Sequence, residues 1–276
     1  MDDLERFLRE DLGERRDITT QALFGRRTPR VGAILYAREP VVAAGVREAG
    51  LTFERLGCRV TFRAPEGRWH KPDRPLLKVR GPLARILMAE RLALNFLGRM
   101  SGIATTTRRL TDIVRKVNPD CRVAGTRKTT PGFRAYEKRA IGLGGGEPHR
   151  AGLYDAILIK DNHLEALGDV GEAVGRARAA KRGPVEIEVG NVRDALEAAR
   201  AGAAWLLIDN LAPKRAGALI QKVRMQHPGV RFECSGGITE ANILAYARHA
   251  NRVSLGALTH SARSADITLD LVLPKR

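Results

Sequence analysis

Aromatic side chains and cysteines are scarce in this 276-residue chain. Phe, Trp and Tyr make up 5% of the residues, which leaves few surfaces on which nucleic-acid bases could stack. The three cysteines, Cys58, Cys121 and Cys234, lie far apart and form no Cys-x-x-Cys pair. An odd number at this spacing argues against a disulfide framework and against a structural zinc site. A reducing compartment such as the cytoplasm is therefore expected.

Long apolar runs are absent as well. No stretch of about 18 apolar residues occurs, so no membrane-spanning helix is expected. The first residues, MDDLERFLRED, are acidic and lack the apolar centre of a secretion signal. These absences favour a protein that is neither secreted nor membrane-bound.

Positive charge is abundant. The 48 Lys and Arg residues against 31 Asp and Glu give a net charge of +17. Such a balance fits nucleic-acid binding, anionic substrates or simply a highly charged surface. Because the basic residues form no tail and no stretch interleaved with aromatics, nucleic acid is not the expected partner. A basic nucleic-acid binder remains the non-enzymatic alternative.

The length predicts about two domains, and the pattern changes along the chain. From about residue 30 to residue 81, short β-rich runs (VGAILYARE, PVVAAGV, CRVTFRAPEG and PLLKVRG) alternate with turn residues. They predict a small, mainly antiparallel α+β unit. Helical spacing then runs from Pro82 to Gly98, and a second helix is predicted from Ile103 to Val117.

Beyond Asp120, apolar runs alternate with helix-compatible segments. The runs are RVAGT, AILIK, VEIEV, WLLID, RFEC and RVSL. This rhythm predicts a parallel sheet or β/α barrel. Polar residues and glycines fall at or just after the carboxyl ends of these runs, namely Arg127, Lys128, Lys160, Glu188, Asp209, Ser235, Gly236, Gly237 and Gly256. Because ligands bind at that rim of β/α barrels, these residues are candidates for a site.

The segment from Gly125 to His163 is the most basic candidate. Its cationic side chains surround a turn of three glycines, Gly144 to Gly146. Glycines let backbone N–H groups approach an anion closely, so the segment predicts a site for a polyanionic small molecule.

Two of the rim residues have alternative interpretations. Lys160 ends an apolar run, and a Schiff-base lysine of an aldolase would look similar. Asp209 could instead cap the helix that follows it.

Glu186 and Glu188 point to the same face by the period of two, and two carboxylates inside a barrel need cationic or ligand partners.

Two glycine-containing turns, 235–239 and 256–261, follow successive strands. Backbone N–H groups in such turns bind phosphate, and two of them in neighbouring barrel units form the usual phosphate site of a barrel. Each turn by itself is a weak signal, since a glycine after a strand is often only a turn.

Taken together and in this order, several segments resemble the quinolinate phosphoribosyltransferase family over nearly the whole chain. They are EDLGERRDITT, ERLALNFLGRMSGIAT, GTRKTTPGFR, GGGEPHRAGLYD, LIKDNH, VEIEV, LLIDN, SGGIT and LGALTHS. The resemblance implies an N-terminal α/β sandwich over residues 1–101, an incomplete, irregular β/α barrel of about six parallel strands over 102–266, and a tail, 267–276, that returns to the sandwich. It also implies a homodimer whose subunits complete each other's sites, and possibly a higher oligomer.

The resemblance further implies a division of labour. Arg127, His149, Arg150 and Lys160, with Arg91 of the partner subunit, would bind the two carboxylates of quinolinate. Phosphoribosyl pyrophosphate would be held by Lys128, Glu188, Asp209, Ser235, Gly236, Gly237, Gly256 and Ala257, together with Mg²⁺ near the two acidic residues. Lys128, Glu188 and Asp209 would be catalytic. The implied reaction yields nicotinate mononucleotide, pyrophosphate and CO₂ in NAD biosynthesis.

The chain departs from the family pattern at three positions. Gly125 stands where many relatives have Asp, Pro148 where Asn often precedes His-Arg, and Cys234 replaces a small residue. None removes a side chain expected to bind substrate, so they bear on substrate detail. A related phosphoribosyltransferase that acts on nicotinate or another small acid without decarboxylation is the alternative.

Overall fold

The computed structural model describes residues 3–14, 17–25 and 28–273. It divides into two compact units, the first comprising residues 1–106 and 262–276 and the second residues 107–261. Arg15 and Arg16, in the N-terminal segment that carried part of the resemblance, lie outside the described residues, as do the last three residues of the tail.

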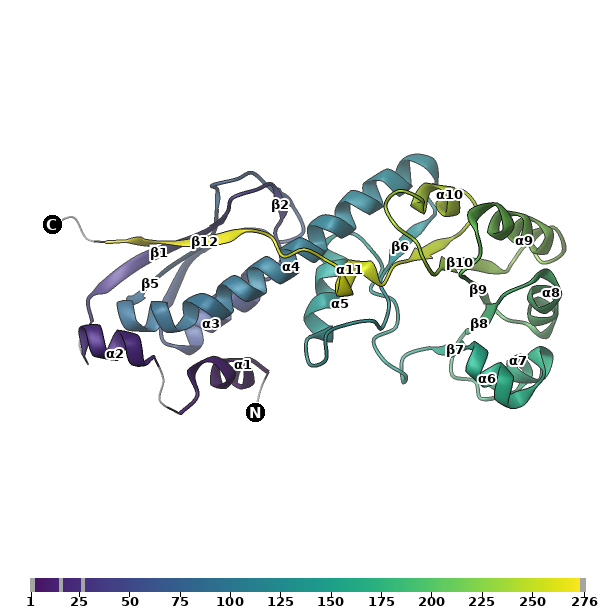
Figure 1. Ribbon diagram of the computed structural model, residues 1–276, viewed down its shortest axis with the longest axis horizontal. Helices are drawn as coiled ribbons and strands as arrows, with labels where there is room; N and C mark the ends of the chain where they lie inside the picture. Colours follow the sequence, from purple (N-terminus) through teal and green to yellow (C-terminus); the bar gives the residue numbers. More distant parts are fainter. Residues whose placement is uncertain (1–2, 15–16, 26–27, 274–276) are drawn as a thin grey trace. The chain divides into compact units, whose positions relative to one another are not determined.

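The first unit is built on an antiparallel sheet in the order β12-β1-β5-β3 (Figure 1). Its last strand, β12, pairs with β1 from Gly32 opposite Val272 to Ala37 opposite Ile267. The elements are α1 (Asp3–Leu12), α2 (Ile18–Phe24), β1 (Arg30–Ala37), β2 (Val41–Val42), α3 (Val46–Arg55), β3 (Arg59–Arg63), β4 (Trp69–His70), β5 (Pro75–Pro82), β12 (Ile267–Val272) and part of α4 (Leu83–Val117). The predicted antiparallel α+β unit is confirmed.

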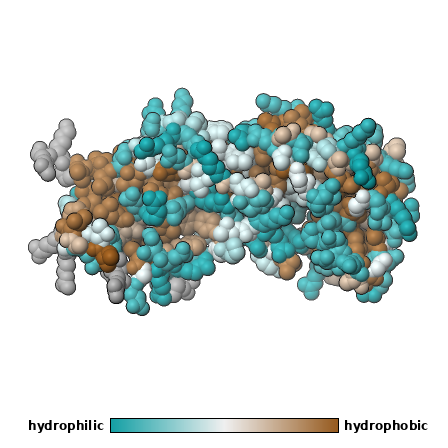
Figure 2. Space-filling model, viewed as in Figure 1, coloured by the Kyte–Doolittle hydropathy of each residue, from teal (hydrophilic) through white to brown (hydrophobic). Residues whose placement is uncertain are grey.

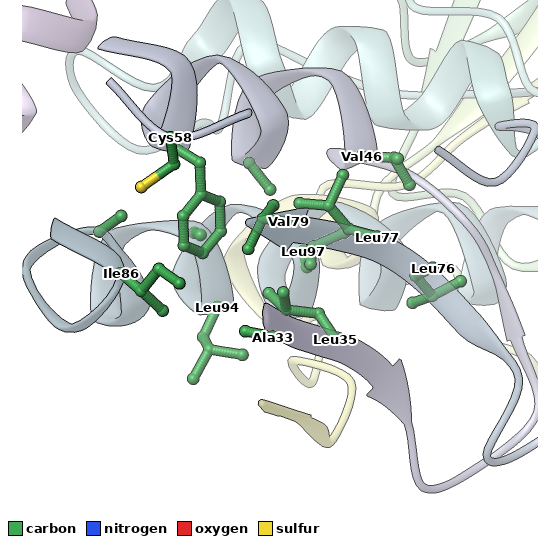
Figure 3. Close-up of a cluster of buried hydrophobic side chains, with 14 of the residues drawn as sticks. Ala33, Leu35, Val46, Cys58, Leu76, Leu77, Val79, Ile86, Leu94 and Leu97 are labelled. Carbon is green, nitrogen blue, oxygen red and sulfur yellow. The ribbon is translucent and has the colours of Figure 1, made fainter. Parts of the chain in front are cut away.

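The core of this unit lies between the sheet and helices α3 and α4. Alternate residues of β1, among them Leu35, are buried in one cluster with Leu77 of β5 and Ile86 of α4 (Figure 3). Fully burying each such side chain contributes about 1.5–3 kcal/mol. The predicted β-rich run PVVAAGV is a strand only at β2, because at Gly45 the backbone turns into α3 with a φ of +85°.

The two predicted helices from 82 to 117 form a single helix, α4, of 35 residues, so the predicted break is wrong. The glycines that suggested it serve close packing. A Cβ atom at Gly102 would lie 2.0 Å from the Arg263 carbonyl oxygen, and one at Gly98 would lie 3.1 Å from that of Ala265. The absence of side chains at these two positions therefore lets residues 263–265 pack against α4. The glycines do not end the helix.

The second unit contains a sheet of six parallel strands in the order β6-β11-β10-β9-β8-β7. Its strands are β6 (Arg122–Ala124), β7 (Ile157–Ile159), β8 (Val185–Val189), β9 (Trp205–Asp209), β10 (Arg231–Ser235) and β11 (Arg252–Ser254). The helices are α5 (Arg134–Leu143), α6 (Asp161–Leu167), α7 (Val170–Ala179), α8 (Val192–Ala201), α9 (Pro213–Gln226), α10 (Ile243–Ala247) and α11 (Ala257–His260). Figure 1 shows α7, α8 and α9 along the outer side of this sheet. All six predicted strands are confirmed.

The sheet curves as an incomplete barrel whose edge strands are β6 and β7. The parallel strands all point their carboxyl ends to one rim, where the candidate residues gather. The described helices include none that is long and apolar enough to cross a membrane. Figure 2 shows hydrophilic side chains over much of the visible surface, as the high content of charged residues requires.

Candidate active site

A cavity of about 600 Å³ lies at the carboxyl ends of the strands in the second unit. Most of the predicted site residues line it: Arg127, Lys128, His149, Arg150, Lys160, Asp209, Ser235, Gly236, Gly237, Gly256 and Ala257. Glu188 lies beside it, bound to Lys160. Segments separated by more than a hundred residues thus meet at one rim, as the barrel topology requires.

Arg127 and Lys128 follow β6 and expose their side chains. Their backbone is fixed, since the Lys128 N–H donates to Thr126 Oγ1 at 3.1 Å and Thr259 Oγ1 donates to the Lys128 carbonyl oxygen at 2.6 Å. Within the described ranges, neither side chain has a carboxylate at ion-pair distance. Two cations on a fixed backbone are thus free to bind an anion.

Arg150 presents a third cation from the loop after α5. Its side chain is 9% exposed and donates to the Ala156 carbonyl oxygen at 3.4 Å. Burial and the neighbouring Arg127 lower the pKa of this guanidinium. A buried cation beside another cation is costly, and a bound dianion would offset that cost.

Lys160 and Glu188 join the ends of two adjacent strands. The Lys160 ammonium lies 2.8 Å from Glu188 Oε2. Glu186, on the same face of β8, lies 3.7 Å from both His149 and Arg252. Glu188 therefore has the cationic partner that its position demands, whereas Glu186 has cationic neighbours only at 3.7 Å and its buried Oε1 has no hydrogen-bond partner among the described residues.

Asp209 ends β9 and is half-buried at the cavity. It does not cap the following helix, because α9 begins at Pro213 after Ala212 and has no side-chain cap. Asn210, whose φ is +56°, donates from its side chain to the Asp209 carboxylate. The alternative interpretation of Asp209 as a helix cap is therefore excluded.

The turns after β10 and β11 form another wall of the cavity. Gly236 has a φ of +81°, and a Cβ atom there would lie 2.2 Å from Asn210 Oδ1. A Cβ atom at Gly256 would lie 2.9 Å from Lys128 Cδ. Because glycine has no side chain, the Lys128 side chain can pack directly against the turn. In the described structure, the amide N–H groups of Gly236 and Gly237 donate to no protein acceptor. They remain available to a ligand.

The three-glycine turn does not form the anion site that was predicted. The amides of Gly144, Gly145 and Gly146 donate to the carbonyl oxygens of Ala140, Gly142 and Ile141, which ends α5. Arg108 binds the Gly144 carbonyl oxygen at 2.9 Å. A Cβ atom at Gly146 would lie 2.6 Å from the Thr107 methyl group, so glycine here permits close packing.

The cavity also includes residues that the sequence did not single out for a site. Glu233 is 3% exposed on β10, and His260 ends α11. A sequence signal for Glu233 existed, because it is a charged residue between the apolar Phe232 and Cys234 and shares a face with Ser235. His260 lies in the glycine turn that was assigned to phosphate as a backbone element.

Arg91 lies in the first unit, on α4, exposed to solvent. With Arg99, Asp266 and neighbouring residues it lines another cavity, of about 400 Å³. Its expected part in the site depends on a second subunit.

Two family models match the chain. The C-terminal domain of quinolinate phosphoribosyl transferase matches residues 103–270, and the N-terminal domain of the same family matches residues 17–101. The two matches meet inside α4.

Curated relatives and solved structures agree with the family models. A Mycobacterium leprae protein named nicotinate-nucleotide pyrophosphorylase (carboxylating) is 40% identical over 98% of this chain and 96% of its own length. One from Methanothermobacter thermautotrophicus, named as probably the same enzyme, is 39% identical over 98% of each chain. The nicotinate-nucleotide pyrophosphorylase structure from Francisella tularensis, 30% identical, superimposes with a TM-score of 0.89 over 97% of this chain and 94% of that one.

Proposed function

Because the chain belongs to the quinolinate phosphoribosyl transferase family, we propose that it transfers the phosphoribosyl group of phosphoribosyl pyrophosphate to quinolinate with decarboxylation. The products are nicotinate mononucleotide, pyrophosphate and CO₂, a step of NAD biosynthesis that we place in the cytoplasm. The observation that carries the proposal is the cavity in which the unpaired cations Arg127 and Lys128, the Asp209 carboxylate and two glycine turns converge, with the Lys160–Glu188 ion pair at its edge.

Quinolinate is a planar dianion, and one side of the cavity suits it. Arg127 and Arg150 can each bind a carboxylate with two parallel N–H groups, and Lys160 and His149 also line the cavity. In the proposed homodimer, Arg91 of the partner subunit completes this pocket. The dianion also relieves the repulsion between Arg127 and the buried Arg150.

The other side of the cavity suits phosphoribosyl pyrophosphate. The free amides of Gly236 and Gly237 and the side chain of Ser235 are donors for its 5-phosphate, with Gly256 and Ala257 beside them. Lys128 suits the pyrophosphate as a point charge. The carboxylates of Asp209 and Glu188 accept hydrogen bonds from ribose hydroxyls.

Mg²⁺ fits this site as a partner of the substrate. It prefers oxygen ligands and is usually held by one or two carboxylates together with substrate phosphates. Asp209 offers such a carboxylate at the cavity, whereas Glu188 is engaged with Lys160. When bound, Mg²⁺ would neutralise charge on the pyrophosphate.

The residues act mainly by position and charge. As the bond from ribose C1 to pyrophosphate breaks, positive charge develops on the ribose, which Glu188 and Asp209 stabilise, while Lys128 stabilises the departing pyrophosphate. The pyridine nitrogen then forms its bond to C1 and becomes cationic. That cationic ring accepts the electron pair left when CO₂ departs from C2, and C2 takes a proton from water.

Product analysis tests the proposal. Purified protein is incubated with Mg²⁺, phosphoribosyl pyrophosphate and either quinolinate or nicotinate, and mononucleotide, pyrophosphate and CO₂ are measured together. Equal amounts of all three from quinolinate are expected. Turnover of nicotinate without CO₂ would identify the non-decarboxylating relative instead. Borohydride trapping of Lys160 with a carbonyl substrate would identify an aldolase, and salt-sensitive nucleic-acid binding without competition by phosphoribosyl pyrophosphate would identify a nucleic-acid binder.

A further inference from the structure

A buried ionic cluster lies inside the barrel, where Glu233 and His149 line the candidate active-site cavity and Arg252 lies next to them. Glu233 of β10 and Arg252 of β11 are register partners on adjacent parallel strands. Arg252 Nη1 lies 2.7 Å from Glu233 Oε2, and His149 Nε2 lies 3.0 Å from the same oxygen. Burial acts to raise the pKa of Glu233, but the hydrogen bond from His149 and the charge of Arg252 lower it well below its ordinary value. The carboxylate is therefore held ionised by these two partners.

Arg252 contacts the His149 loop at two points. One is direct, since its Nη2 lies 2.6 Å from Glu147 Oε1, and the other is through Glu233 Oε2, to which both Arg252 Nη1 and His149 Nε2 bind. Its guanidinium also lies over the ring of Trp205, 4.0 Å from the centroid. Arg252 is thereby fixed on the sheet and reaches both residues that flank Pro148.

His149 links this cluster to Arg150. The Arg150 backbone N–H donates to His149 Nδ1 at 2.8 Å, so that nitrogen carries no proton and Nε2–H donates to Glu233. His149 has a φ of +59°, a conformation that costs a non-glycine residue about 1–3 kcal/mol unless its surroundings impose it. The two hydrogen bonds of the ring impose this conformation here. The backbone conformation of His149 in turn sets the position and direction of the Arg150 backbone.

His149, Glu186 and Glu233 are grouped closely enough to suggest a metal site. The guanidinium of Arg252 already occupies the position of a cation, at 2.7 Å from Glu233 and 3.7 Å from Glu186. A metal ion would have to displace this charge, so the cluster is an internal ion pair.

We propose that Glu233 and Arg252 are positioning residues for substrate binding. They fix the ring and backbone of His149 and thereby direct the Arg150 guanidinium into the cavity. That the Arg150 guanidinium binds quinolinate in particular rests on the proposed function. A purely structural ion pair would affect the stability of the fold and leave substrate affinity unchanged.

Glu233→Gln is the first test. Glutamine keeps an acceptor for His149 Nε2–H but removes the charge that holds Arg252. The KM for quinolinate should rise by between about tenfold and a hundredfold, because a displaced Arg150 weakens a charge-assisted hydrogen bond to a substrate carboxylate, while the KM for phosphoribosyl pyrophosphate stays within about twofold. Glu240→Gln, which breaks an exposed ion pair with Arg109, is the matched control and should leave both constants unchanged.

The double variant Glu233→Gln with Arg252→Met separates position from stability. Removing both buried charges together should restore most of the melting temperature that Glu233→Gln lowers, because the buried guanidinium without its carboxylate is gone and Glu147, the other partner of Arg252, is partly exposed to water. The KM for quinolinate should stay high. If it returns to the parental value together with the melting temperature, the two residues act only through stability and the proposal is overturned.

A crystal structure of the Glu233→Gln variant shows the position of the Arg150 guanidinium without any measurement of turnover. The Arg150 guanidinium should be displaced from the cavity wall, and an unchanged Arg150 would overturn the proposal even if the parent protein used another substrate. Failure of the parent to consume quinolinate would instead count against the proposed function alone.

Discussion

The Lys160 ammonium and the Glu188 carboxylate lie 2.8 Å apart, across the carboxyl ends of the adjacent strands β7 and β8. In the proposed reaction, Lys160 serves quinolinate and Glu188 serves the ribose. The ion pair therefore joins the two halves of the cavity. It also holds both side chains at the rim before any substrate binds.

Glu188→Gln tests the electrostatic role of this carboxylate. The amide keeps the size of the side chain but cannot stabilise positive charge on the ribose, so kcat should fall by about a hundredfold to a thousandfold. The measurement is kcat with both substrates saturating. A parental kcat would show that Glu188 takes no part in stabilising the oxocarbenium-like transition state.

Gly236→Ala tests the turn after β10. An alanine would have to adopt a φ of +81° and place its Cβ 2.2 Å from Asn210 Oδ1, so the turn must shift. We expect a loss of about 1–3 kcal/mol in the free energy of unfolding and a higher KM for phosphoribosyl pyrophosphate. Urea denaturation and initial-rate kinetics measure the two effects.

Gly175→Ala is the control for that substitution. Gly175 lies in α7 with an ordinary φ, and its added Cβ would meet nothing within 4 Å. Because alanine favours a helix over glycine, this change should stabilise the fold by about 0.5–1 kcal/mol and leave kinetics unchanged. Equal effects of the two substitutions on the KM would show that the turn does not bind the phosphate.

The sequence was most informative where a run of apolar residues predicted a strand and polar residues followed the carboxyl end of that strand. Six apolar runs predicted six parallel strands, and residues at their carboxyl ends, such as Arg127 and Asp209, line one cavity because a barrel brings strand ends together. Local glycine patterns were less informative. Gly98 ends the first of two predicted helices, yet it lies within α4 and lets a chain segment from more than a hundred residues away pack against this helix.

Contacts between distant segments explain the other differences. The amides of Gly144 to Gly146 could not be assigned from sequence, because their acceptors are decided by how α5 ends. Glu233 was missed for a similar reason. The sequence shows a carboxylate within a strand, but only the pairing of β10 with β11 shows that its partner is Arg252.

The Arg91 proposal has a test that uses two inactive proteins. Arg91→Ala and Lys160→Ala subunits should each form dimers with little activity. After mixing and subunit exchange, hybrid dimers contain one intact site of two, so random pairing should restore about a quarter of the parental activity. Isotope-labelled subunits followed by native mass spectrometry establish that exchange occurred. No recovery in spite of exchange would place Arg91 outside the site.

Glu186 gives the fold a specific dependence on pH. Burial, with the nearby Glu233 carboxylate, raises the pKa of Glu186 from its ordinary 4.5 to about 8. Between these two values the folded protein keeps a proton that the unfolded chain releases, so this group's contribution to stability is complete below pH 4.5 and is lost as the pH rises through about 8.

Glu186→Gln should remove that dependence. The amide remains uncharged and can donate to Glu233 as the protonated acid does, so the variant should melt close to the parent at pH 5 and above it at pH 8. Thermal denaturation at both pH values measures the difference, with Glu240→Gln as the exposed control. An equal difference at the two pH values would mean that Glu186 is already ionised in the folded protein at pH 5, because a carboxylate whose pKa is not raised gives stability no slope in this range.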